Sequence, residues 1–140
     1  MSTVLIYTSP ARGHLYPMMD VALAMQAAGH RVVVQTLAAE REHVQAAGIE
    51  HRPLAAAIEG IELADHRARG TRALLQAALD CWATRAPHEV DDLGATLSDL
   101  APDLVHPTEH RALKDIWESS GMDASVLEVI DMELGGGGQP

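Results

Sequence analysis

The sequence has no phenylalanine and only two tryptophans and two tyrosines among its 140 residues. Large aromatic side chains therefore contribute little to the core. Alanine, leucine, valine and isoleucine make up most of the 47% hydrophobic content. At this length they can build one domain with a continuous aliphatic core, and two large domains do not fit.

Cysteine is also scarce, and long hydrophobic runs are absent. A single cysteine, Cys81, excludes an internal disulfide framework, and we interpret it as a small buried side chain on a helix. No run approaches the roughly 18 apolar residues that span a bilayer. Residues 1–7 lack the basic and apolar segments of a secretory signal. We therefore expect a cytoplasmic protein without a membrane span.

Positive charge is in short supply as well. The sequence has ten Lys and Arg residues and 20 Asp and Glu residues, which gives a net charge of −10. Nucleic acids and anionic membranes are therefore repelled on average, and neither is an expected partner. A small basic cluster, Arg67, Arg69 and Arg72, is interpreted as a solvated loop and helix start; binding of a phosphate or an anionic acceptor is the alternative.

The N-terminal third of the chain has a strand–helix–strand pattern. Residues 4–7 and 31–36 are short runs rich in β-formers, which suits buried parallel strands. Between them, Pro17 suits the first turn of a helix whose apolar residues recur at helical spacing as far as Gly29. The segment therefore predicts a βαβ unit, whose crossover is right-handed in nearly all proteins.

The rest of the chain continues this alternation. Residues 55–69 are expected to form a loop with one helical turn near 58–64. Helix 71–85 is predicted to carry one apolar face, and Pro87 to separate it from the next helix. The remaining predicted helices are 38–47, 89–100 and 109–120, and the remaining predicted strands are 49–54, 103–105 and 125–130.

These patterns predict an α/β protein with a Rossmann-like three-layer α/β/α fold and a mainly parallel sheet of about five strands. We expect one domain over residues 1–134. Residues 135–140 contain four glycines and predict a flexible tail.

The first strand-to-helix loop, residues 8–16, is the predicted ligand site, because ligands of open parallel sheets bind beyond the carboxyl ends of the strands. Gly13 is its only glycine, so the G-x-G-x-x-G motif of dinucleotide sites is absent. His14, expected just before a helix N-terminus, is suited to act as a general base toward a hydroxyl group. The alternative is that His14 only forms part of the loop-to-helix junction.

Several segments together resemble the N-terminal signature of family 1 glycosyltransferases with the GT-B fold, such as macrolide and plant UDP-sugar enzymes. The shared pattern is a strand, G-H-x-x-P, an apolar helix and G-H-x-V, over about 35 residues. It is carried here by Gly13-His14-Leu15-Tyr16-Pro17, Leu23-Ala24 and Gly29-His30-Arg31-Val32. Weaker support comes from Ala46-Ala47-Gly48 and from Pro102-Asp103-Leu104-Val105 followed by Gly121.

This resemblance implies that His14 is the catalytic base of an inverting hexose transfer from a nucleotide sugar. In the family an Asp after the fourth strand orients the base; here that stretch reads His106-Pro107-Thr108-Glu109, so Glu109 is the candidate orienting carboxylate. The substrate-binding candidates of the first loop are Ser9, Arg12 and Gly13. Acceptor hydroxyls of small molecules are the implied substrates.

The resemblance also implies that the donor, a UDP- or dTDP-sugar, binds mostly to a second domain for which this chain has no room. We therefore expect no tightly bound cofactor, and an isolated chain that is inactive without a donor-domain partner chain; a truncated or decayed copy of such an enzyme is the alternative. Apolar surface left uncovered would favour a homo-oligomer. The alternative is a non-catalytic module with a Rossmann-like fold that binds a small molecule or another protein.

Other polar residues receive structural interpretations. His106 and His110 lie four apart beside Glu109, but Pro107 intervenes and no third ligand has suitable spacing, so no metal site is expected. His30 is interpreted as bonding the end of the preceding helix. The acidic residues Asp91 and Asp92 are expected to contribute only to solubility.

Overall fold

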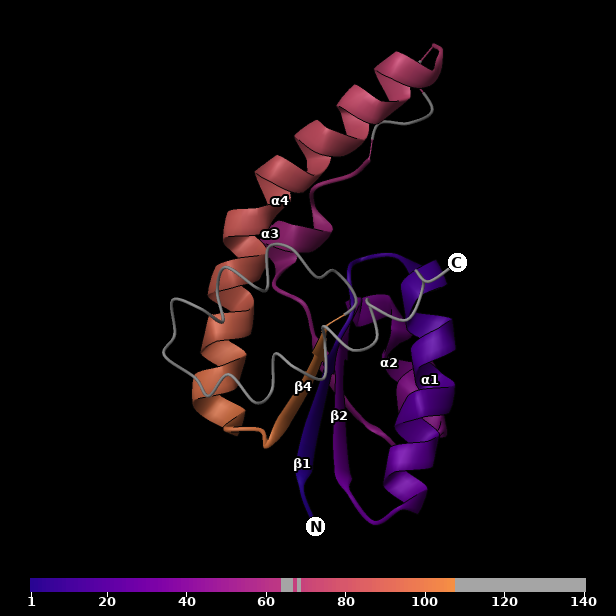
Figure 1. The fold of residues 1–140 in the computed structure, drawn as a ribbon, viewed down its shortest axis with the longest axis vertical. Coiled ribbons are helices and arrows are strands. Elements are labelled where there is room, and N and C mark those ends of the chain that lie inside the picture. Colours follow the sequence, from indigo (N-terminus) through magenta and orange to yellow (C-terminus); the bar gives the residue numbers. More distant parts are fainter. Residues whose placement is uncertain (64–66, 68, 108–140) are drawn as a thin grey trace, which may run out of the picture.

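A computed structural model describes residues 1–63, 67 and 69–107 of the chain. Within them, four parallel strands form one sheet in the order β3-β2-β1-β4 (Figure 1). The strands are β1 (Thr3–Tyr7), β2 (Arg31–Thr36), β3 (Glu50–Pro53) and β4 (Leu104–Pro107). This confirms the predicted α/β class and parallel sheet. The fifth predicted strand, residues 125–130, lies outside the described residues.

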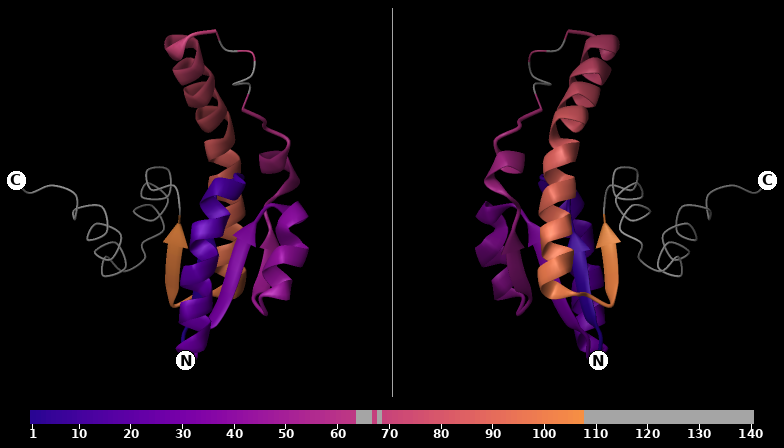
Figure 2. Two further views of the ribbon diagram at one scale, coloured as in Figure 1. Left: turned by 90° about the vertical axis from the view of Figure 1, so that its right-hand side faces the viewer. Right: turned by 90° about the vertical axis from the view of Figure 1, so that its left-hand side faces the viewer.

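Helices cover both faces of this sheet, as Figures 1 and 2 show. On one side lie α1 (Arg12–Ala27) and α2 (Arg41–Ala46), preceded by the short η1 (Ala38–Glu40). On the other side lie α3 (Ala56–Glu59) and the long α4 (Thr71–Leu100). The three-layer arrangement is therefore confirmed for the described residues.

The core is divided between the two faces because successive side chains of a strand point in opposite directions. In β1, Val4 and Ile6 pack with the α1 side, whereas Leu5 and Tyr7 pack with the α4 side. All four are buried. As expected from the two-sided burial of parallel sheets, β1 reads as a continuous apolar run rather than an alternating one.

Helix α1 begins five residues before the predicted start at Pro17. Ala11 is extended, and Arg12, Gly13 and His14 form the first turn of the helix. Pro17 lacks an N–H group and so leaves the Gly13 carbonyl without its helical partner. Gly13 is exposed, so water can hydrate this carbonyl. His14 thus lies inside the helix, and its predicted placement before the N-terminus is wrong.

Helix α4 runs without a break from Thr71 to Leu100, and Pro87 lies inside it. The predicted division into two helices is wrong. Proline removes the hydrogen bond to the Ala83 carbonyl, but both residues are exposed and this carbonyl can be hydrated. Arg85 and Glu89, on either side of Pro87, are both buried. Figure 1 shows that α4 bends between its first and its second half, as helices commonly do at a proline.

No helix in the described part of the chain combines the length and the hydropathy needed to cross a membrane. The predicted helix 109–120 and the predicted tail 135–140 lie outside the described residues. Among the described residues, the shorter elements agree with their predictions to within a few residues, with two exceptions. The predicted helix 38–47 is divided into η1 and α2. The predicted turn near 58–64 occurs earlier, as α3.

Replacing Pro87 with alanine tests whether α4 is one helix. The change supplies the missing N–H and removes a ring clash, so we expect the free energy of unfolding to rise by about 1–3 kcal/mol. Urea unfolding followed by circular dichroism measures it. A neutral or destabilising result would indicate instead that Pro87 separates two helices.

Candidate functional site

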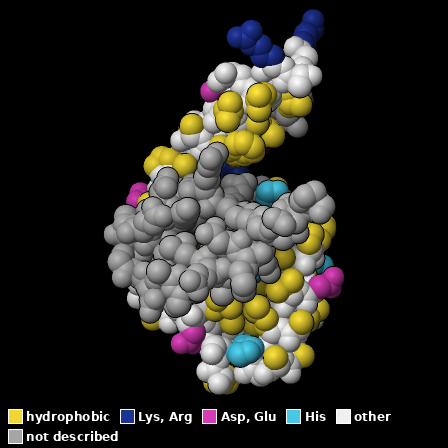
Figure 3. Space-filling view, in the orientation of Figure 1, with side chains coloured by type: hydrophobic (Ala, Val, Ile, Leu, Met, Phe, Trp, Pro, Cys, Tyr) yellow, Lys and Arg dark blue, Asp and Glu magenta, His cyan; other side chains and the backbone are white. Residues whose placement is uncertain are grey.

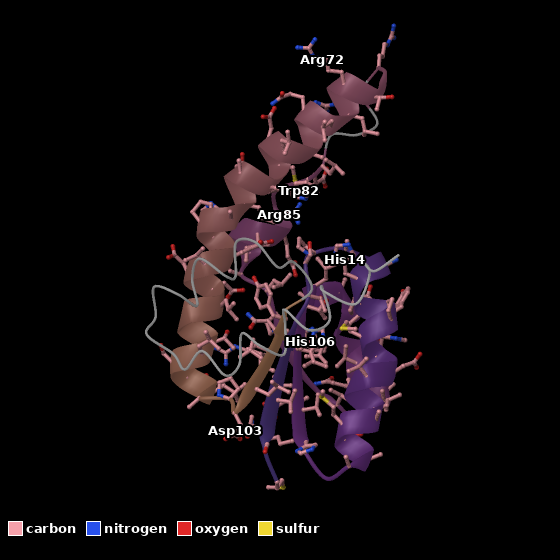
Figure 4. The ribbon with its side chains drawn as sticks, viewed as in Figure 1. His14, Arg72, Trp82, Arg85, Asp103 and His106 are labelled. Atoms are coloured by element: carbon pink, nitrogen blue, oxygen red, sulfur yellow. The ribbon has the colours of Figure 1, made fainter. Side chains whose placement is uncertain are left out.

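The candidate site lies at the carboxyl end of the sheet, where β1 ends and the chain turns into α1. Thr8 and Ser9 follow β1 directly and are both buried. His14 stands at the start of α1 at this end of the molecule (Figure 4), and its side chain is exposed. An imidazole in this place can be reached by a dissolved substrate.

Hydrogen bonds hold the short connection between β1 and α1. The Thr8 amide donates to the Gln35 carbonyl at 3.0 Å, and the Thr8 hydroxyl bonds to the Thr36 hydroxyl at 2.7 Å. Further along, the Ala11 amide donates to the Ser9 carbonyl at 2.6 Å, and the His14 amide donates to the Ala11 carbonyl at 3.0 Å. Bonds to β2 and bonds within the connection therefore constrain the backbone that carries His14.

The three predicted substrate-binding residues differ in their availability. Arg12 forms an ion pair with the buried Glu40, with Nε and Oε1 2.6 Å apart. Ser9 is buried and accepts a hydrogen bond from Arg85. Gly13 faces open space, since a Cβ added there would meet no atom within 4 Å. Of the three, Gly13 has the surface that a ligand could approach most closely.

Arg85 on α4 is a site residue that the sequence patterns did not reveal. It is only 7% exposed. Its Nη1 lies 3.3 Å from Ser9 Oγ, its Nη2 lies 2.8 Å from Cys81 Sγ, and its nearest approach to the Glu89 carboxylate is 3.8 Å. Figure 4 shows it at the same end of the sheet as His14. The signal available was the i, i+4 spacing of Cys81, Arg85 and Glu89 on one helix face.

Asp92 is a second polar residue with a role beyond solubility. Its Oδ2 accepts hydrogen bonds from Gln35 Nε2 at 2.9 Å and from the Ala55 amide at 3.2 Å. Burial raises the pKa of the Asp92 carboxyl, while the Ala55 hydrogen bond, the charge of Arg52 and the Gln35 hydrogen bond partly oppose the shift. Asp92 therefore joins α4 to the sheet, and the prediction that it only aids solubility is wrong.

The raised pKa of Asp92 predicts a pH-dependent stability difference. The folded state binds this proton more tightly than the unfolded state, so stability is lost as pH rises through the interval between the two pKa values. Asp92→Asn can keep an accepting oxygen but does not titrate. We expect the free energy of unfolding of Asp92→Asn, relative to the unmodified chain, to increase from about pH 4 to about pH 7.

Urea unfolding of both proteins at the two pH values measures this difference, and the other carboxylates cancel in the comparison. Asp91→Asn is the matched control because Asp91 neighbours Asp92 on the exposed side. A constant or falling difference for Asp92→Asn would contradict the raised pKa.

The fourth strand contains the first two residues of the stretch 106–109, in which Glu109 is the candidate orienting carboxylate. His106 and Pro107 belong to β4 itself, beside Ile6 and Tyr7 of β1, rather than to the stretch that follows the strand. Glu109, the candidate orienting carboxylate, and His110 lie outside the described residues. Among the described residues, no group of three or more His, Cys, Asp or Glu side chains could hold a metal ion.

His30 has a structural place and bonds the end of the preceding helix, as predicted: its amide donates to the Met25 carbonyl of α1 at 3.2 Å. Its Nδ1 lies 3.4 Å from the Ser2 amide, which can donate to it. The interaction joins the start of the chain to the turn between α1 and β2, at the end of the sheet opposite to His14.

The first half of α4 carries apolar side chains that face solvent. Trp82 is 51% exposed and Leu75 is 57% exposed, and Leu74 and Leu79 are nearly as open. Figure 3 shows hydrophobic side chains along the part of α4 that extends beyond the sheet, with basic side chains at its tip. The apolar face predicted for this helix is present, but the sheet covers only its continuation in the second half.

Comparison with solved structures places this fold among glycosyltransferases. The Streptomyces sp. SF2575 glycosyltransferase SsfS6 matches with a TM-score of 0.58 and 22% identity, over 76% of this chain and 33% of that one. SnogD from Streptomyces nogalater matches at 0.56 and 23%, over 76% and 27%. The calicheamicin glycosyltransferase CalG4 matches at 0.60 and 19%, over 96% and 42%.

The chain therefore spans about a quarter to two fifths of the length of these enzymes. No protein-family model matches the sequence, and no curated protein matches it. The structural likeness confirms, at the level of the fold, the resemblance that the G-H-x-x-P segment predicts: the chain has the fold found in part of GT-B glycosyltransferases.

Proposed function

We propose that this chain is the acceptor-binding part of an inverting glycosyltransferase that uses a nucleotide sugar. The observation that carries the proposal is the exposed imidazole of His14 at the carboxyl end of a parallel sheet whose fold matches glycosyltransferases. Ligands of such sheets bind at this end. The fold alone does not specify an activity; the side chain that supports this one is His14.

The proposed chemistry is general-base catalysis. His14 accepts the proton of an acceptor hydroxyl while that oxygen attacks the anomeric carbon of the sugar. The bond between this carbon and the nucleotide's phosphate oxygen breaks, and the nucleoside diphosphate leaves with the bonding electrons. One displacement from the opposite side inverts the configuration at the anomeric carbon.

The first turn of α1 suits this role. It places an exposed imidazole, a group that can accept a proton from a hydroxyl, at the carboxyl end of the sheet. The Gly13 surface beside it is open to an approaching molecule. Glu109 remains our candidate for the carboxylate that orients the ring.

The proposed co-substrate is a UDP- or dTDP-sugar held mainly by a second domain. SsfS6 and the spinosyn rhamnosyltransferase SpnG, which share this fold, have been solved with thymidine diphosphate. We extend that nucleotide class to this chain as a proposal. The acceptor is proposed to be a small molecule with a hydroxyl group.

His14→Ala tests the base. With a donor-domain polypeptide, a nucleotide sugar and a hydroxyl acceptor supplied, we expect the transfer rate to fall by about 10²–10⁴-fold, the usual contribution of a general base. Chromatographic detection of the glycosylated product measures the rate.

His43→Ala is the matched control, since His43 is an exposed histidine on α2 whose ring packs edge-on against Tyr16 of α1. It should retain the transfer rate. Equal rates for His14→Ala and the unmodified chain would remove His14 from the mechanism.

A second candidate is a non-catalytic module that binds another polypeptide, and the exposed apolar face of α4 favours it. Monomeric proteins seldom expose a contiguous patch of large apolar side chains, and such patches often mark interaction sites. This face can also belong to the enzyme, as the contact with a donor-domain chain.

The apolar face predicts concentration-dependent self-association of the purified chain. Leu79→Gln places a polar group in the centre of the face and should lower the association constant by about tenfold, as expected for losing one apolar contact of ~1.4 kcal/mol. Sedimentation velocity over a range of concentrations measures it, with Leu23→Gln on exposed α1 as control. A strict monomer at every concentration would exclude this contact.

A further inference from the structure

We infer that Arg85 is a positioning residue that sets the location of His14 through the connection between β1 and α1. Three hydrogen bonds link the two residues. Arg85 Nη1 donates to Ser9 Oγ at 3.3 Å, the Ala11 amide donates to the Ser9 carbonyl at 2.6 Å, and the His14 amide donates to the Ala11 carbonyl at 3.0 Å. The catalytic meaning of this link rests on the proposed function, but the link itself does not.

Burying the Arg85 guanidinium, which makes the hydrogen bond to Ser9, costs hydration free energy. A guanidinium that is 7% exposed has lost most of its hydration, and its Nε has no hydrogen-bond partner. The Glu89 carboxylate, 3.8 Å away, balances the charge from beyond hydrogen-bond distance. Buried ion pairs add little net stability compared with apolar side chains of similar size. Arg85 therefore contributes specificity of conformation more than stability, and the conformation that it specifies is that of Ser9.

The link also spans the two layers of helices. Arg85 comes from α4 on one face of the sheet, whereas His14 belongs to α1 on the other (Figures 2 and 4). Ser9 lies between them at the end of the central strand. A shift of α4 relative to the sheet is therefore transmitted to the turn that carries His14.

A second anchor holds the same turn from the β2 side. Arg12, the first residue of α1, pairs with Glu40 of η1, and that carboxylate is buried. Removing the Arg85 contact leaves this ion pair in place. The expected effect of losing the Arg85–Ser9 hydrogen bond is therefore a local loss of order between Ser9 and His14.

Backbone NMR order parameters of the full chain test the inference. In Arg85→Met and in Ser9→Ala, we expect the order parameters of Ala11 and His14 to fall from about 0.85, the value of rigid backbone, toward about 0.6. The carbon-bound proton resonances of the His14 ring should shift in both variants, while those of the His51 ring stay in place.

Two further proteins make the test specific. Arg52→Met breaks the ion pair of Arg52 with Asp99, another contact between α4 and the sheet, and should leave Ala11 and His14 unchanged. The double variant Ser9→Ala/Arg85→Met should lose less order than the sum of the two single variants, because both changes remove the hydrogen bond between Arg85 and Ser9.

Unchanged order parameters and ring resonances in Ser9→Ala would overturn the inference, as would additive losses in the double variant. Ser9→Ala decides the question even where Arg85→Met fails to fold, since it removes a single oxygen atom. None of these measurements uses a sugar, so they hold whether or not transfer occurs. Absence of transfer by the unmodified chain with its donor domain would count against the proposed function and leave this link standing.

Discussion

The central strand β1 is the element on which the candidate site depends. It lies between β2 and β4, and both of its faces are buried by helices. The register of β1 with its neighbouring strands is therefore fixed, because a shift by one residue would turn its apolar side chains to the wrong faces of the sheet. The chain leaves β1 through Thr8 and Ser9, and everything that follows, including the first turn of α1 and His14, starts from that fixed end.

Polar contacts carry this constraint from the sheet to the helices. Thr8 bonds to β2, Ser9 receives Arg85 from α4, and Asp92 joins Gln35 to the start of the segment after β3. Each contact is partly or wholly removed from water, so each donor or acceptor left without a partner would cost about 1–3 kcal/mol. The site is accordingly built on a network that tolerates few alternative arrangements.

The sequence predicted those parts of the fold that follow from local patterns. The valines at 32–34 indicate a buried strand because β-branched side chains favour extended backbone, and the structure confirms it. The ends of helices were harder to predict from the sequence. Ala11 caps α1 without a side-chain hydrogen bond, so no capping residue marks the true start of the helix. Pro87 was a misleading stop, because packing on both sides keeps α4 continuous.

Long-range partners could not be predicted at all. Arg85 and Ser9 are 76 residues apart, and only the folded chain brings them together. Helical spacing likewise identifies an apolar face on α4 without saying whether the sheet covers it. The G-H-x-x-P segment, in contrast, indicated both the fold and the location of the candidate site, because a short loop after the first strand of a parallel sheet can lie only at the carboxyl end.

The proposed function requires that small-molecule acceptors bind at this end of the sheet, beside His14. Amide chemical shifts of the labelled chain, recorded while a panel of apolar hydroxyl compounds is added, test it most directly. We expect saturable shifts confined to residues 8–14 and their neighbours. Shifts confined to the opposite end of the sheet, around Gly29 and His30, would contradict it.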